Sequence, residues 1–94
     1  MEKLGKCVWI FLGEGARHPA AVFSDRVSAE AWIRQSGVSG LLTAYPLNQS
    51  VYDWAIERGF FTPKEPYQKE TRFLAKFSSA HLEHYHFIEG ERET

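Results

Sequence analysis

The chain has 94 residues, of which 44% are hydrophobic and 24% charged, and its formal net charge is −1. This length predicts one domain, and this composition is typical of a globular fold. The small net charge argues against a nucleic-acid partner, because proteins that bind the phosphate backbone carry a basic surface. No apolar run approaches the roughly 20 residues that a membrane-spanning helix needs, so we expect a soluble protein without a membrane partner.

The single cysteine and the first residues indicate where the protein works. Cys7 has no second cysteine in the chain to pair with, and its apolar neighbours predict a buried, inert thiol. The residues before it are too few, and too soon followed by Trp9 and Gly13, to form a signal peptide. We therefore expect the protein to be cytoplasmic.

Two strands are predicted at the start of the chain. Residues 7–12 form an unbroken apolar run that Gly13 closes, which is typical of a strand covered on both faces. Residues 13–19 contain two glycines and a proline, a composition that predicts a long loop. Residues 20–24 then form a short second strand, which the loop allows to pair antiparallel with the first.

A helix is predicted after the second strand. Ser24 or Asp25 can accept hydrogen bonds from the free N–H groups of its first turn. Apolar residues then recur with the period of an amphipathic helix, and Gly37 stands where a helix commonly ends. The positions expected to face the core are Ala29, Trp32, Ile33 and Ser36.

A third strand and a second helix follow. Residues 41–47 have the composition of a strand, and Pro46 ends it or places it at an edge, because proline has no N–H to donate to a ladder. Ser50 can cap the next helix, which Gly59 ends. Trp54 lies on the inner face of that helix, as Trp9 and Trp32 lie on the inner faces of their elements.

The last third of the chain predicts a linker, a helix and a strand. Residues 60–66 form an extended segment with two prolines, and residues 70–77 form a third helix with Phe73, Leu74 and Phe77 inward. Residues 82–88 alternate with the period of a strand. We expect Tyr85 and Phe87 to face the core, because they bring the larger apolar surface, and His84 and His86 to face outward.

The order ββαβααβ predicts an α+β fold. In this fold two or three helices cover one face of a mainly antiparallel, four-stranded sheet. The absence of repeats, low-complexity tracts and linkers between domains favours a single domain over residues 1–94. Its ordered core is expected at about residues 7–89, followed by a polar tail at residues 90–94.

Several blocks of the sequence resemble, in order, the pattern of a small, uncharacterised bacterial domain family. The matching blocks are Val8-Trp9, Gly13–Arg17, Ala29–Ile33, Leu42–Leu47, Tyr52–Ile56, Phe77–Ala80, Glu83–His86 and Glu89-Gly90. They cover nearly the whole chain, from residue 7 to residue 90. The chain departs from the pattern at His18, where the family usually has an aromatic residue, and at Phe87, where it has tyrosine. The resemblance implies a stand-alone bacterial domain and no activity.

Three of the four histidines lie close together in the sequence, at His81, His84 and His86. On a strand, His84 and His86 share one face about 6–7 Å apart, a spacing at which two imidazoles can bind one metal ion. The alternatives are two half-exposed histidines bonded to backbone or carboxylate groups, or a surface patch that responds to pH. Two ligands alone indicate a metal only weakly, and we expect no cofactor.

The segment from Gly13 to Arg17 can be interpreted as an anion-binding loop or as a plain turn. Two glycines free the backbone N–H groups, and Arg17 can meet an anion. The segment lacks the Gly-Lys-Ser/Thr of a phosphate-binding loop and joins two strands, which favours the turn. No pair of acidic residues has a spacing that predicts an acid and a base in one cleft, so we expect no enzyme.

The aromatic residues, 15% of the chain, outnumber what so small a core can bury. Exposed tyrosine and phenylalanine are typical of protein-binding surfaces. The sequence therefore favours a non-catalytic protein-binding domain. Its most concrete form is an immunity-type protein that neutralises a basic bacterial toxin, with Glu83, Glu89 and Glu91 facing the toxin's active site.

Two other functions stay open from the sequence. One is a small metal-binding protein or metal-dependent enzyme built on His84 and His86, and the other is a ligand-sensing regulatory domain. Neither comes with a complete set of site residues. The residues predicted to bind a partner are Arg17, Glu83, His84, Tyr85, His86 and Glu89.

Overall fold

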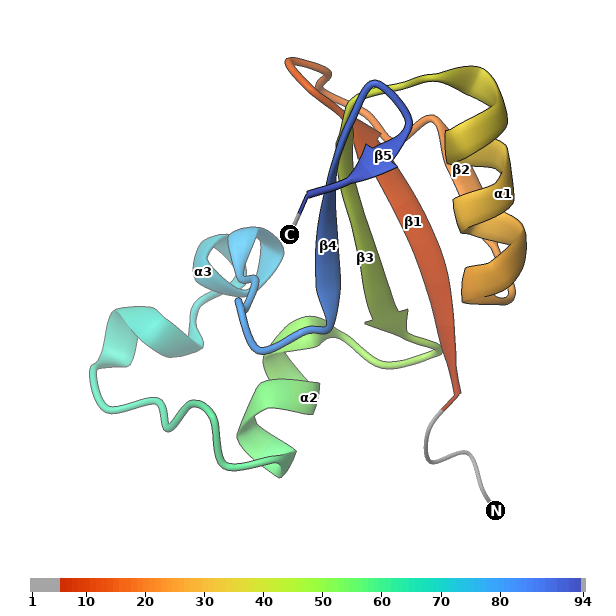
Figure 1. The fold of residues 1–94 in the computed structure, drawn as a ribbon. Helices are drawn as coiled ribbons and strands as arrows, with labels where there is room; N and C mark the ends of the chain where they lie inside the picture. Colours follow the sequence, from red (N-terminus) through yellow and green to blue (C-terminus); the bar gives the residue numbers. More distant parts are fainter. Residues whose placement is uncertain (1–5, 94) are drawn as a thin grey trace. The chain divides into compact units, whose positions relative to one another are not determined.

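The computed structural model describes residues 6–93 and groups them into two compact units (Figure 1). Among these residues, the first unit contains 6–47 and 82–93, and the second contains Asn48–His81. The predicted α+β class is confirmed. Among the described residues, no helix is long and apolar enough to cross a membrane.

The first unit is built on an antiparallel sheet with the strand order β2–β1–β3–β4–β5 (Figure 1). Its strands are β1 (Cys7–Gly13), β2 (Ala21–Phe23), β3 (Gly40–Pro46), β4 (His84–Ile88) and β5 (Glu91–Arg92). The two longest strands, β1 and β3, pair over their full length, and Pro46 ends β3 as predicted. The sheet therefore has five strands, and the expected number of four was wrong.

The fifth strand arises because the chain turns back after β4 where a polar tail was expected. Glu89 and Gly90 both have left-handed backbone angles, with φ of 47° and 85°, as a tight two-residue hairpin requires. The N–H of Glu89 donates to Oγ of Ser39 at 2.8 Å, and the N–H of Gly90 donates to the carbonyl of Val38 at 2.9 Å. These bonds hold the turn against the chain that follows α1.

Helix α1 (Arg26–Ser36) covers one face of this sheet (Figure 1). Asp25 caps it, because Oδ1 of Asp25 accepts a hydrogen bond of 2.7 Å from the N–H of Ser28. Gly37 ends it in the left-handed conformation, with φ of 71°. Both ends lie where the sequence predicts them.

The core of the first unit lies between α1 and the sheet. Its buried members are Trp9, Phe11, Ala29, Ile33, Leu42, Ala44 and Phe87. Cross-strand pairs build it, since Trp9 lies opposite Ala44 and Phe11 lies opposite Leu42. Trp32 is half-buried against this core, with its ring edge-on to Phe11 at 5.6 Å between centroids.

Strand β4 alternates as the sequence predicts. Phe87 is 4% exposed and Tyr85 is half-buried, and both lie on the face that α1 covers. His84 and His86 are exposed and lie on the other face. The larger apolar side chains therefore take the inward positions.

The second unit contains helix α2 (Val51–Glu57), a 3-10 helix η1 (Pro66–Lys69) and helix α3 (Thr71–Lys76). Oγ of Ser50 caps α2 by accepting a 3.0 Å bond from the N–H of Asp53, and Trp54 is buried. The start of α2 and the existence of α3 are confirmed. The helix η1 was not predicted. Of the helices expected on one face of the sheet, α1 is the one shown to lie there.

Four aromatic rings form the centre of the second unit. They belong to Tyr52, Phe61, Phe73 and Phe77, and every pair of them lies within 6.3 Å between centroids. The hydroxyl of Tyr52 donates to the carbonyl of Gln68 at 2.8 Å. Phe73 and Phe77 therefore face inward as predicted, whereas Leu74 is exposed and its expected inward position was wrong.

Candidate functional site

The residues predicted to bind a partner do not gather at one place. They are Arg17 in the exposed β1–β2 loop, Glu83 and Tyr85 on the α1 side of the sheet, His84 and His86 on the other side, and Glu89 in the β4–β5 turn. Neighbouring residues of a strand point to opposite faces. The run Glu83–His86 therefore contributes to two different surfaces.

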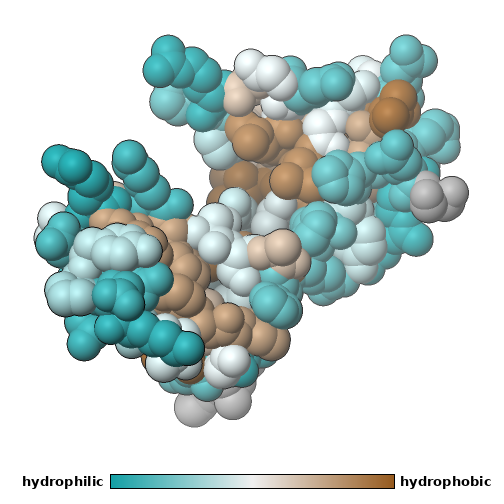
Figure 2. All heavy atoms as spheres, turned by 90° about the vertical axis from the view of Figure 1, so that its left-hand side faces the viewer, coloured by the Kyte–Doolittle hydropathy of each residue, from teal (hydrophilic) through white to brown (hydrophobic). Residues whose placement is uncertain are grey.

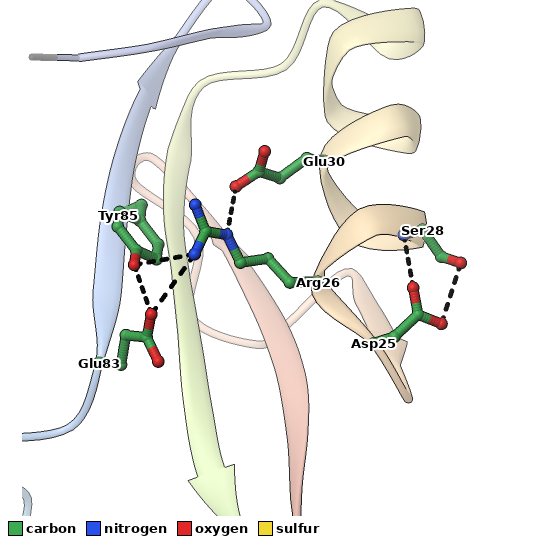
Figure 3. Close-up of polar contacts among 6 residues, drawn as sticks. All are labelled: Asp25, Arg26, Ser28, Glu30, Glu83 and Tyr85. Atoms are coloured by element: carbon green, nitrogen blue, oxygen red, sulfur yellow. Dashed lines mark hydrogen bonds and ion pairs between the residues drawn. The ribbon is translucent and has the colours of Figure 1, made fainter.

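On the α1 side, Tyr85 belongs to a polar network with Arg26 at its centre (Figure 3). Nε of Arg26 donates to Glu30 at 2.8 Å, and Nη1 donates to the hydroxyl of Tyr85 at 3.0 Å. That hydroxyl in turn donates to the carboxylate of Glu83. The guanidinium carbons of Arg26 and Arg92 lie 4.2 and 4.8 Å from the centroid of the Tyr85 ring.

The network favours the protonated forms of Tyr85 and Arg26. The pKa of Tyr85 is raised, first because its hydroxyl donates to the carboxylate of Glu83. The pKa of Arg26 is raised, first by its hydrogen bond to Glu30. The hydrogen bonds from Arg26 on α1 to Tyr85 and Glu83 link α1 to β4 and the residue just before it. Glu83 is thereby committed to contacts within the chain.

The other face of the sheet has hydrophobic side chains at its surface. We call it the open face, because no helix covers it among the described residues of the first unit. One row of residues across the strands contains Leu12, Leu41 and His86. The next row contains Val22, Ile10, Thr43 and His84. Ile88, two residues after His86 on β4, lies on the same face. Val22 is 62% exposed, Ile88 53% and Leu12 36%. Figure 2 looks onto this side, where hydrophobic side chains gather with hydrophilic ones along their border.

A hollow of about 360 Å³ lies at the end of the open face beside the β1–β2 loop. Leu12, Leu41 and Ile88 supply apolar walls, and Glu14 and Glu93 add two carboxylates. An apolar wall with acidic groups suits a side chain that has an aliphatic stem and a positive end, such as lysine or arginine. The hollow is therefore the most specific feature of the open face.

The two histidines lie close together on the open face, with no third metal ligand beside them in the part of the chain that the structure describes. Their ring centroids are 5.9 Å apart, and Nδ1 of His84 lies 2.7 Å from the carbonyl oxygen of Leu82. No group of three His, Cys, Asp or Glu side chains that could hold a metal occurs within residues 6–93. His84 and His86 are therefore surface groups beside the exposed aliphatic side chains.

The exposed aliphatic residues of this surface were not predicted from the sequence. The apolar run of β1 predicted a strand covered on both faces, yet Leu12 is exposed. A signal was available, because placing the helices on one face of a sheet leaves the other face without a cover. The apolar residues on that second face needed another explanation.

A family model described as a domain of unknown function, DUF7710, matches residues 8–93. No curated protein and no solved structure matches the chain. The family match includes both compact units and confirms the resemblance to a small uncharacterised domain family that the sequence blocks indicated. The chain belongs to the DUF7710 family.

Proposed function

We propose that this protein is a cytoplasmic, non-catalytic domain that binds another protein through its open face. The observation that carries the proposal is the exposure of three aliphatic side chains, Leu12, Val22 and Ile88, on one face of one sheet. Large apolar patches on a protein surface commonly mark interaction sites. Burial against a partner removes this surface from water and contributes about 25 cal/mol per Å².

The charges around the open face favour a basic partner. Glu14 and Glu93 line the hollow, and Glu91 pairs across the β4–β5 ladder with Ile88. The first unit carries six Lys and Arg against eight Asp and Glu, a formal charge of −2. Acidic and basic surfaces attract each other during encounter and suppress wrong partners.

The most concrete form of this proposal is an immunity-type protein that neutralises a basic bacterial toxin. The acidic groups offered to such a toxin are Glu14, Glu91 and Glu93 on the open face, with Glu89 in the neighbouring turn. Glu83 takes no part, because Arg26 and Tyr85 hold it on the other side of the sheet. The histidine pair of β4 lies on the same face and offers polar groups to the partner.

The test uses three single variants as bait for proteins of the source cell. Val22→Glu and Ile88→Glu place a charge on the open face at positions more than half exposed, where folding tolerates it. Val27→Glu is the matched control, because Val27 is 80% exposed on α1. We expect wild type and Val27→Glu to capture one basic partner in equal amounts and to release it at high salt. The two open-face variants should lose it.

The immunity form has its own outcome. The captured partner, expressed alone, should stop growth, and co-expression of wild type or Val27→Glu should restore it while Ile88→Glu should not. A partner retained equally by all three variants would show that binding uses another surface. A partner that is harmless when expressed alone would reject the immunity form and keep the binding function.

A further inference from the structure

The second unit has a cavity of its own, separate in sequence and lining from the open face. Its volume is about 570 Å³, within the range of roughly 300–1,000 Å³ that is usual for small-molecule sites. The side chains that line it and matter for binding are Tyr67, Glu70, Arg72, Phe73, Lys76 and Phe77. Figure 2 shows hydrophobic side chains of this unit bordered by hydrophilic ones.

Aromatic rings form the apolar wall of this cavity. The rings of Phe73 and Phe77 lie 5.8 Å apart, and the ring of Tyr67 meets Phe73 edge-on, also at 5.8 Å. Tyr52 and Phe61 pack behind them, so the wall is held in place without a ligand. Aromatic walls favour a flat ring as occupant, because ring pairs gain energy beyond their buried area.

Two positive side chains stand beside this wall. Arg72 and Lys76 are one helical turn apart on α3 and both line the cavity. Neither forms an ion pair with a carboxylate of residues 6–93, although Glu70 lines the same cavity. A guanidinium binds a carboxylate through two parallel hydrogen bonds, and a lysine adds a point charge. The charge of the cavity therefore favours an anion.

We propose that this cavity binds a small aromatic carboxylate. The ring system packs against Tyr67, Phe73 and Phe77, and the carboxylate meets Arg72 and Lys76. This function goes beyond the open face, since it uses none of the residues proposed to bind a protein partner. The pair of positive charges selects the anion, and the aromatic wall selects the flat body.

The test is an NMR titration of the full chain with two probes of the same ring system. One probe is 2-naphthoate, and the other is its neutral analogue 2-naphthalenemethanol. We expect saturable shifts at the amides of Tyr67, Phe73 and Phe77. The carboxylate should bind about threefold to tenfold more tightly than the alcohol, the range for one or two charge-assisted contacts near a surface.

Matched variants separate charge from shape. The double variant Arg72→Gln, Lys76→Gln should bind 2-naphthoate only as tightly as it binds the alcohol. Its affinity for the alcohol should equal that of wild type. The control double variant, Lys64→Gln, Lys69→Gln, removes the same charge from the same unit outside the cavity. It should bind both probes with the affinity of wild type. Tyr67→Ala, at a side chain already 56% exposed, should weaken both probes because it removes part of the wall.

Three results would overturn the proposal. The first is equal affinity for the two probes, which would show a general apolar cavity. The second is an equal loss of affinity in the control double variant, which would show attraction to net charge alone. The third is the absence of saturable shifts at the cavity. Because the open-face residues lie outside the cavity, none of these results bears on the proposed protein partner.

Discussion

Gly13 and Gly40 face each other across strands β1 and β3, yet their surroundings differ. A Cβ at Gly40 would lie 2.3 Å from the carbonyl oxygen of Leu12 and 2.8 Å from Cα of Gly13. Both are backbone atoms of β1 at the end of its ladder with β3, so neither can give way without disturbing the pairing of the two strands. A Cβ at Gly13 would meet nothing nearer than Ala16 at 3.8 Å, an ordinary contact.

We therefore predict opposite responses to the same substitution. Gly40→Ala should lower the free energy of unfolding by more than about 2 kcal/mol, as forced overpacking does. Gly13→Ala should change it by less than about 1 kcal/mol, because alanine fits there and loses less backbone entropy on folding. Urea unfolding of both variants in one buffer measures the difference. Equal effects would mean that the two strands separate easily enough to admit the extra methyl group.

The carboxylate of Asp25 makes the stability of the first unit depend on pH. Its pKa is lowered from 3.8, first because its carboxylate accepts a hydrogen bond from the backbone N–H of Ser28. A lowered pKa in the folded state stabilises the fold fully above the unfolded value, and the gain disappears as the pH falls through the folded value. The cap should therefore weaken in the acid range below 3.8.

Asp25→Asn isolates this effect, because asparagine also caps helices but does not titrate. We predict that the melting temperature of wild type falls more than that of Asp25→Asn between neutral pH and a pH below 3.8. The other carboxylates titrate equally in both proteins, so they cancel in the comparison. An equal fall in both would show that the backbone bond to Ser28 does not depend on the charge.

At the scale of the element, strand β4 separates a structural face from an exposed one. Phe87→Ala should cost about 3–5 kcal/mol, since Phe87 belongs to the buried core. Tyr85→Ala should cost more than about 2 kcal/mol through lost packing and hydrogen bonds. His84→Ala and His86→Ala should stay within about 0.5 kcal/mol, as surface changes do. Chemical unfolding measures all four. A large loss at either histidine would contradict the exposed position of the pair.

Some elements were predictable because the information is local. The end residues of α1 are a capping aspartate and a left-handed glycine, and both act through neighbouring backbone atoms. The facing of β4 follows from its alternation and from the size of its side chains. Strand β5 was not predictable, because its turn depends on contacts of Glu89 and Gly90 with Ser39 and Val38, about 50 residues earlier in the chain.

The candidate sites were less predictable than the elements. The sequence placed His84 and His86 on an outward face, but a strand pattern does not tell which aliphatic residues share that face across other strands. Register decides this, and it brings Leu12 beside Leu41 and His86. In α3, Phe73 was assigned to a core, and nothing local shows that the same ring also lines a cavity.

At the scale of the whole molecule, the charges are divided unevenly between the two units. The first unit has a formal charge of −2, and the second, with five Lys and Arg against four Asp and Glu, has +1. The net charge of −1 conceals this division. The charge of each unit is opposite in sign to that of its proposed ligand, a basic protein for the first unit and an aromatic anion for the second. Salt should weaken both interactions by screening them.

Stability should also be distributed unevenly along the chain. Strands β1 and β3 are each paired on both sides, and their side chains Phe11 and Leu42 are buried almost completely. Helix α3 has six residues, none of them fully buried, and a helix this short has little stability of its own. Backbone hydrogen bonds in regions with few buried contacts open most often.

We therefore predict a gradient in native-state hydrogen exchange. Amides in the middle of β1 and β3 should exchange only through unfolding of the whole sheet, so their opening free energy should equal that from chemical unfolding. Amides of α3 should open with a much smaller free energy, and those of the edge strands β2 and β5 should fall between. Exchange followed by NMR at several low denaturant concentrations measures each group. Equal protection in α3 and β3 would contradict the gradient, because it would require the two elements to open in a single cooperative step.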